Sequence, residues 1–289
     1  MNKTKGFLSL LLAGFLFGIF GVLVRILNSE LSNYQQIFFR SVVGLILASL
    51  IIYILKRKIS FKNISLINLF FFAISLPLSI IFYTLAILKT KIMLAVATLF
   101  LGSILFSLIS GVLFFKEKIT VKKILAILTS ILALYYFTIP FSLTNINIGL
   151  IFGILSGFAD ALSNSFKKHL GGKADRFLLI AVQMVGTMAV SFILMSYTKT
   201  LTLPQISPYI FIIGLLFGLG LLVNNYLMLI GFGNFDLNLG TIILSSELLF
   251  ASIFGYLFYK EIPTVNEVIG SGLIAFSVII AHLNFKKNN

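Results

Sequence analysis

The 289-residue chain contains no cysteine, no tryptophan, only two histidines and only 10% charged residues. Without cysteine it can form neither a disulfide nor a thiolate metal site. His169 and His282 lie near the ends of apolar segments, so we expect no histidine-based zinc site or catalytic triad. A soluble domain carries about 25% charged residues. The scarcity of charge therefore excludes a soluble enzyme or a free nucleic-acid-binding protein.

Apolar residues make up 59% of the chain, and its mean hydropathy is +1.11. A membrane-spanning helix needs about 20 mostly apolar residues, and ten stretches of the sequence meet this requirement. We therefore expect an all-α membrane protein with ten transmembrane helices. The first stretch contains Arg25 and lacks a clear cleavage site, so we expect it to be retained rather than removed as a signal peptide. The predicted spans cover residues 7–27, 34–55, 65–88, 92–115, 121–139, 148–168, 177–197, 209–230, 238–259 and 266–284.

Basic residues outnumber acidic ones by 22 to 8, and their positions predict the topology. If the N-terminus is cytoplasmic, 16 of the basic residues fall in inner segments and four in outer segments. Lysine and arginine accumulate in cytoplasmic loops. This distribution predicts a protein of the cytoplasmic membrane with both termini inside. The basic loops, such as 116–123 and 167–176, are expected to contact anionic lipid. They lack interleaved aromatic residues, which argues against nucleic-acid binding.

The two halves of the chain resemble each other. The sequence GVLFFKEKITV of residues 111–121 recurs at 255–265 as GYLFYKEIPTV, with seven of eleven positions identical. This offset of 144 residues is half of the chain, and an offset of 143 aligns Arg25 with Lys168. Each half holds five predicted spans, and because five is odd, the second copy must lie upside down relative to the first. We therefore predict two inverted five-helix repeats, residues 1–144 and 145–289.

Three sequence features carry a resemblance to known transporters. Glu117 and Glu261 each end a Gly-x-x-x-x-x-Glu segment, Phe38-Phe39-Arg40 lies in the second span, and Ser245-Ser246-Glu247-Leu-Leu-Phe-Ala lies in the ninth. With these features the chain resembles, over nearly its whole length, the EamA-type family of the drug/metabolite transporter superfamily. The resemblance implies a ten-helix transporter, and family members move amino acids, nucleotide-linked metabolites, cofactors and drugs. The family often has proline after the position of Glu247, where this chain has Leu248.

Two carboxylates lie near the middle of predicted spans. Asp160 falls in the sixth span and Glu247 in the ninth, too deep for either short side chain to reach the membrane surface. An ionisable group at such a depth costs at least about 2.5–3.5 kcal/mol, so each is a candidate for function that faces a cavity or a partner. Asn164, four residues after Asp160, shares its helix face. These carboxylates could exchange a coupling proton, bind a substrate ammonium group, or make a structural hydrogen bond or ion pair between helices.

Arginines and neutral polar residues extend the set of candidates. Arg40, about 9 Å inside the second span, suits either a clamp for a carboxylate or phosphate or a structural ion pair. Arg25, near the outer end of the first span, is expected to be an interfacial anchor or a partner of Glu30, with substrate contact as the alternative. Glu117 and Glu261 lie at membrane boundaries and are expected to form ion pairs or caps that fix loops. Four neutral residues could line a cavity and bind polar substrate atoms, or could hydrogen-bond between helices: Gln183, Asn224, Asn225 and Tyr226.

The sequence contains no Gly-x-x-x-x-Gly-Lys-Ser/Thr phosphate loop, so transport would draw its energy from an ion gradient, exchange or the substrate's own gradient. We predict a secondary active transporter that moves a small polar metabolite by alternating access, without a metal or cofactor and with protons as a candidate coupling ion. Asp160 and Glu247, opposed by Arg40, favour an amino acid or another amino-bearing metabolite as substrate.

Two other classes of protein are compatible with the composition. A non-transporting membrane subunit or sensor could use the same buried charges for structure alone. An intramembrane lipid-modifying enzyme would need acids, bases or a metal clustered at one membrane face. The acidic residues are dispersed and the two histidines are far apart in the sequence, so we do not expect an enzyme.

Overall fold

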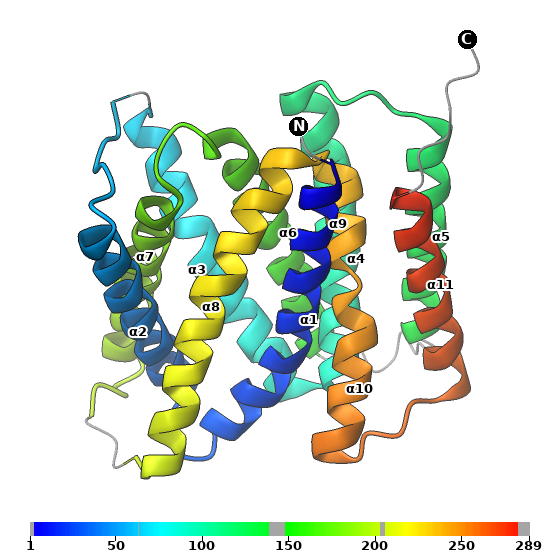
Figure 1. Ribbon diagram of the computed structural model, residues 1–289. Coiled ribbons are helices and arrows are strands. Elements are labelled where there is room, and N and C mark those ends of the chain that lie inside the picture. Colours follow the sequence, from blue (N-terminus) through cyan, green and yellow to red (C-terminus); the bar gives the residue numbers. More distant parts are fainter. Residues whose placement is uncertain (1–2, 63, 139–147, 203–205, 283–289) are drawn as a thin grey trace.

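The computed structural model describes residues 3–62, 64–138, 148–202 and 206–282, which form eleven helices joined by short connections and contain no strand (Figure 1). The predicted all-α class is confirmed. The helices are α1 (Lys3–Leu27), α2 (Asn33–Ile54), α3 (Leu66–Lys89), α4 (Ile92–Phe115), α5 (Val121–Thr138), α6 (Ile148–Leu170), α7 (Arg176–Tyr197), α8 (Pro208–Asn234), α9 (Leu237–Leu244), α10 (Glu247–Tyr259) and α11 (Val265–His282).

The helices follow the predicted spans closely, and their ends coincide with the charged and polar residues between apolar runs. Within the described ranges, nine stretches are long and apolar enough to cross a membrane, and α9 with α10 makes one of them. The eighteen-residue α5 is the remaining helix, so the count of ten spans stays a prediction. The predicted ends at residues 139 and 284 lie outside the described residues.

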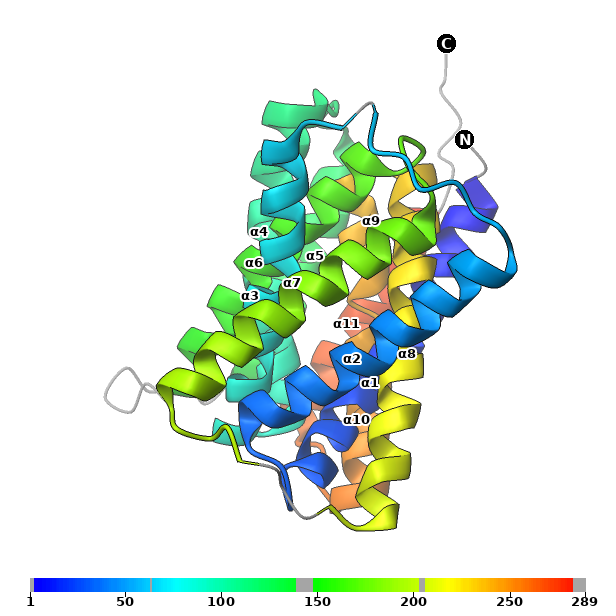
Figure 2. The ribbon, with the colours of Figure 1, turned by 90° about the vertical axis from the view of Figure 1, so that its left-hand side faces the viewer.

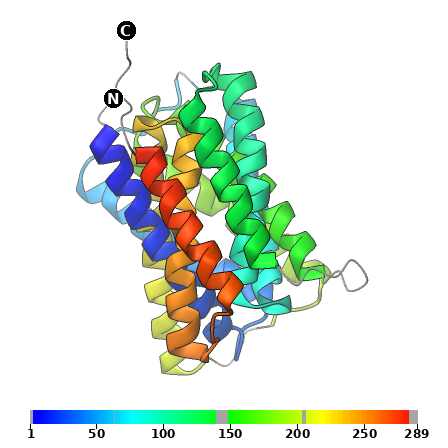
Figure 3. The same cartoon turned by 90° about the vertical axis from the view of Figure 1, so that its right-hand side faces the viewer.

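The bundle has a helix pair on each flank, and the other seven described helices lie between the two pairs (Figure 1). Figure 2 shows α2 and α7 packed side by side on one flank, and Figure 3 shows α5 and α11 on the opposite one. In the centre α1 packs against α8 and α10, while α6 packs against α3 and α4. Large apolar side chains are exposed along the outer helix faces, as expected where lipid replaces water as the solvent.

Glycines allow α4 and α6 to approach closely. Gly102 on α4 faces Gly157 on α6, and a Cβ atom added to Gly157 would collide with the carbonyl oxygen of Leu99. Small residues at such contacts are the usual way in which membrane helices pack tightly. This close approach brings the Ser103 hydroxyl of α4 within reach of Asp160 on α6.

The predicted ninth span is broken in the middle. The helix stops at Leu244, and α10 starts at Glu247 after the pair Ser245 and Ser246. The break occurs although the chain has Leu248 where the family often has proline. Because of it, the Glu247 carboxylate lies in the first turn of α10, deep inside the bundle, where the backbone N–H groups of a helix start favour a negative charge.

Left-handed helix ends repeat along the chain. Within the described ranges four non-glycine residues have positive φ, and all four are lysines: Lys56 (47°), Lys116 (51°), Lys199 (54°) and Lys260 (53°). They form two pairs separated by 143 and 144 residues, the offsets found in the sequence. The backbone N–H that follows Lys116 and Lys260 donates to a glycine carbonyl six residues earlier, at 3.0 and 3.3 Å. Such conformations are uncommon for residues with a Cβ atom, so the two halves share an unusual local geometry.

Candidate functional site

A small central cavity lies where seven helices meet. It has a volume of about 40 Å³, and its polar lining consists of Tyr83 (α3), Asp160 (α6), Asn225 (α8) and Glu247 (α10), with Ser79. The remaining lining is apolar: Phe17, Leu76, Ile80, Leu99, Phe100, Leu221 and Leu244. A cavity of this size can hold water.

Asp160 receives two hydrogen bonds on one carboxylate oxygen. The Ser103 hydroxyl donates to Oδ2 at 3.0 Å, and the Asn164 amide donates to the same atom at 2.8 Å. Asp160 is 7% exposed and Asn164 is fully buried. The structure thus brings Asp160 and Asn164 together as the helix spacing implies. The contact of Ser103 was not predicted from the sequence. Serines in apolar helices commonly hydrogen-bond to their own helix backbone, so the residue type alone does not indicate a contact with another helix.

Glu247 is bound by a tyrosine from the other half of the chain. The Tyr83 hydroxyl donates to Glu247 Oε1 at 2.9 Å, and Glu247 is 2% exposed. Tyr226, one of the residues that the sequence suggests for the lining of a cavity or for an interhelical hydrogen bond, lies 143 residues after Tyr83. Tyr226 instead stacks on Phe177, with ring centroids 5.0 Å apart, away from the central cavity. Tyr83, at the equivalent position in the first half, lines the central cavity instead.

Arg40 is buried without a carboxylate partner in the described part of the chain. One guanidinium nitrogen donates to the Thr84 hydroxyl at 3.1 Å, and the guanidinium carbon lies 4.4 Å from the centroid of the Phe217 ring. Its Nε has no hydrogen-bond partner among the described residues, and neither amide atom of Gln36, one turn earlier on α2, has one. Arg40 therefore keeps donor capacity for a further acceptor. Thr84 follows Tyr83 in α3, but Arg40 is not among the residues that line the central cavity.

The predicted amide residues fall in different surroundings. Asn225 lines the central cavity and donates to the Leu221 carbonyl at 3.0 Å, leaving its Oδ1 without a partner among the described residues. Asn224 is also buried, and both of its amide atoms lack a described partner. Gln183 donates to the Ser163 hydroxyl at 3.0 Å, an interhelical contact between α7 and α6 outside the cavity. Of Gln183, Asn224 and Asn225, only Asn225 lines the cavity that contains the two carboxylates.

Arg25 forms an ion pair at one end of the bundle. Its guanidinium lies 2.6 Å from Glu261 Oε1 and donates to the Thr90 carbonyl at 3.0 Å, and it covers the Tyr259 ring at 4.9 Å. The expected pairing with Glu30 is wrong. Glu30 lies beyond the end of α1 and accepts a hydrogen bond from the Ser207 backbone at 2.7 Å. We call Arg25, Thr90, Tyr259 and Glu261 the Glu261 cluster.

Glu117 organises a second cluster at the opposite end. Lys168 donates to its Oε1 at 2.8 Å, and Lys123 donates to its Oε2 at 3.1 Å. The first residues of α9 add the Leu237 backbone N–H at 2.7 Å and the Asn238 amide at 2.8 Å. We call these five residues the Glu117 cluster. Glu117 thus ties the connection between α4 and α5 to α6 and α9.

The two clusters are related by the internal repeat. Glu117 and Glu261 are 144 residues apart, and their cationic partners Lys168 and Arg25 are 143 apart. Each pair joins an acid from one half of the chain to a cation from the other half. The same contact is therefore made twice, once at each end of the bundle.

Acidification is expected to weaken the Glu117 cluster. Burial raises the pKa of Glu117, but the hydrogen bond and charge of Lys168, with contributions from Leu237 and Lys123, hold this pKa below its usual range. A carboxylate with a depressed pKa stabilises the fold above its unfolded-state pKa, and this contribution is lost as the pH falls through the folded-state value. Between about pH 6 and pH 3, the apparent melting temperature of the protein in detergent should fall more steeply than that of Glu117→Gln. Parallel curves for the two proteins would contradict this assignment.

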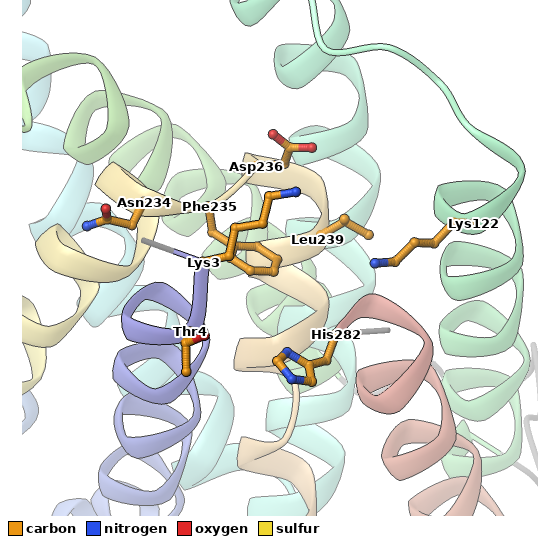
Figure 4. A pocket seen from close by; sticks show the side chains of 8 residues that line it. All are labelled: Lys3, Thr4, Lys122, Asn234, Phe235, Asp236, Leu239 and His282. Carbon is orange, nitrogen blue, oxygen red and sulfur yellow. The ribbon is translucent and has the colours of Figure 1, made fainter. Parts of the chain in front are cut away.

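A polar pocket opens beside the Glu117 cluster, between the starts of α1, α5 and α9 and the end of α11. It has a volume of about 80 Å³ and is lined by Lys3, Thr4, Lys122, Asn234, Phe235, Asp236, Leu239 and His282 (Figure 4). Asp236 also lies 3.1 Å from Lys123. Leu239 lines this pocket and Leu244 lines the central cavity, so α9 leads from one to the other over about 8 Å.

Comparison with known proteins identifies the family. The model of the EamA-like transporter family matches residues 4–139 and again residues 147–283. The chain belongs to the EamA-like transporter family. This EamA-like chain is thus an integral, multi-pass membrane protein of the drug/metabolite transporter type, built from two copies of one family unit. A solved structure designated "Crystal structure of protein" has a TM-score of 0.71 at 13% identity, over 96% of each chain, which shows a shared fold. No curated protein matches the chain.

Proposed function

We propose that this protein is a secondary transporter that carries a small polar metabolite across the cytoplasmic membrane by alternating access. The main observation in its support is a small central cavity, lined by the carboxylates Asp160 and Glu247, that lies between two equivalent ion-pair clusters at opposite ends of the bundle. Transport proteins with repeated halves open such a cavity to one side at a time. The two clusters would close the cavity on the two sides.

An inverted relation between the halves supports this proposal. Lys3 at the start of α1 and Asp236, which pairs with Lys123 of the Glu117 cluster, line one pocket, whereas Lys168 of that cluster belongs to the last turn of α6. Helix α1 thus starts at the end where its repeat equivalent α6 stops. Opposite directions are what an inverted repeat requires. With the predicted topology, the Glu117 cluster faces the cytoplasm and the Glu261 cluster faces outside.

The buried charges favour a zwitterionic substrate, an amino acid or a similar amino-bearing metabolite. Asp160 and Glu247 offer carboxylates in the cavity to an ammonium group, and Arg40, which lies outside the cavity lining, offers the unpaired donor Nε to a carboxylate. Asn225 Oδ1 adds a free acceptor in the cavity. A substrate that carries both charges would leave no charge of its own uncompensated in the low-dielectric centre of the membrane.

Uptake by the purified protein tests the proposal. Proteoliposomes that contain this chain alone should accumulate at least one of a panel of radiolabelled neutral amino acids, measured with and without an imposed pH gradient. Stimulation by the gradient would identify protons as the coupling ion. No uptake of any member of the panel would contradict the favoured substrate class. No uptake of a wider set of polar metabolites would favour a subunit or sensor that needs a partner.

A further inference from the structure

A lysine that the charge pattern assigns to a cytoplasmic loop is buried inside the bundle. Lys167 lies within α6, which continues to Leu170, and it has no exposed surface. Its ammonium group lies 3.4 Å from Asn164 Oδ1 and 3.7 Å from the sulfur of Met228. None of the ion pairs in the described ranges includes it. A buried ammonium with one distant oxygen acceptor is far from satisfied.

Asn164 connects this lysine to the carboxylate of the central cavity. Its amide donates to Asp160 Oδ2 at 2.8 Å, and its Oδ1 faces the Lys167 ammonium. Asp160, Asn164 and Lys167 have the spacing i, i+4, i+7 and share one face of α6. Helical side chains lean towards the N-terminus of their helix, so the lysine chain extends towards Asp160. The two charges thus form an ion pair bridged by one amide.

We propose that Lys167 is an internal counter-ion that takes the place of the substrate's amino group at Asp160 when the carrier is empty. The proposal rests on the proposed transport function. A transporter must return its empty site across the membrane, and an unpaired buried carboxylate makes that step unfavourable. Lys167 supplies the missing positive charge through Asn164. When a substrate amine binds Asp160, the lysine is released from this role.

A double-mutant cycle tests the bridged pair without any substrate. Apparent melting temperatures are measured in detergent for Asp160→Asn, Lys167→Met and the double variant. Each single change leaves one buried charge unbalanced and should lower the melting temperature by several degrees. The double variant has neither charge, so its melting temperature should regain at least half of the drop caused by the more damaging single change. Lys168→Met is the matched control, because the neighbouring lysine binds Glu117, and its effect should add to that of Asp160→Asn. Additive losses for Lys167 and Asp160, or a double variant no more stable than Lys167→Met, would overturn the pair.

The transport role is tested by comparing two modes of flux. Proteoliposomes receive a radiolabelled mixture of neutral amino acids, and net uptake into empty vesicles is compared with exchange into vesicles preloaded with the unlabelled mixture. Only net uptake requires the empty carrier to return, so Lys167→Met should lower the ratio of net uptake to exchange at least tenfold. Lys173→Met, a change in the connection between α6 and α7, should leave this ratio as in the wild type.

The outcomes separate this role from the transport function itself. Wild-type flux with equal losses in both modes for Lys167→Met would overturn the counter-ion role and leave the transporter assignment standing. Thermal coupling between positions 160 and 167, without wild-type flux in either mode, would overturn both the proposed function and the role of the lysine in it.

Discussion

Replacing Glu247 by glutamine, or Asp160 by asparagine, is expected to reduce amino-acid uptake into proteoliposomes about 100-fold. Each change keeps the size of the side chain and removes the negative charge that would bind a substrate ammonium group or a coupling proton. Loss of one partner of a buried charged hydrogen bond costs about 2–5 kcal/mol, and each 1.4 kcal/mol corresponds to a tenfold change. The initial rate of uptake at a fixed ratio of protein to lipid measures the effect.

Glu267→Gln is a matched control for this loss of charge. Glu267 is also buried, but it accepts a hydrogen bond from the Thr264 backbone at 2.6 Å as part of a capping box at the start of α11. Glutamine serves equally in that position, so this variant should transport at the wild-type rate. Wild-type rates in Asp160→Asn and Glu247→Gln as well would remove both carboxylates from the mechanism and assign them to structure.

The helical framework could be predicted because apolar length and charged boundaries both mark membrane spans. The break in the ninth span could not. It lies between two serines in a continuous apolar run, and the proline that often marks this place in the family is Leu248 here. Without proline or glycine, nothing in the local composition distinguishes Ser245 and Ser246 from serines inside an unbroken helix. The depth of Glu247 was predictable, but its place at a helix start was not.

Only the charged residues of the candidate site could be predicted from the sequence. Asp160, Glu247 and Arg40 stand out because ionisable groups are rare within spans. Their hydrogen-bond partners Ser103 and Tyr83 are ordinary residues of apolar helices, and they gain a role only when distant helices pack together. The repeat alignment pairs Tyr83 with Tyr226 but contains no information about which copy faces the cavity.

The pairing of charges between the two repeats could not be predicted from the sequence either. Glu117 and Glu261 match each other, and so do Arg25 and Lys168, yet each acid binds the cation from the other half of the chain. A linear comparison finds equivalent positions within the halves. It does not show which residues of the two copies come into contact, so the pairing of each acid with the other copy's cation appears only in the structure.

Neutralising Glu261 is expected to open the cavity towards the outer side. Because the natural chain has no cysteine, Asn225→Cys gives a single thiol that lines the central cavity. Adding Glu261→Gln weakens the ion pair to Arg25, and a hydrogen bond to a charged group contributes about 1.5–3 kcal/mol. The reaction of this thiol with a membrane-impermeant reagent, applied outside intact cells, should therefore be about tenfold faster.

The equivalent change at the other end should have the opposite effect. Glu117→Gln weakens the Glu117 cluster, which favours opening towards the cytoplasm, so the thiol at position 225 should react more slowly from outside. Glu30→Gln is the control for a lost charge at the outer end, because Glu30 binds only the Ser207 backbone in the described structure and should leave the reaction rate unchanged. Equal acceleration by Glu261→Gln and Glu117→Gln would indicate general loosening of the bundle. Opposite shifts of similar size would show that one repeated contact, made in two orientations, balances access to the two sides.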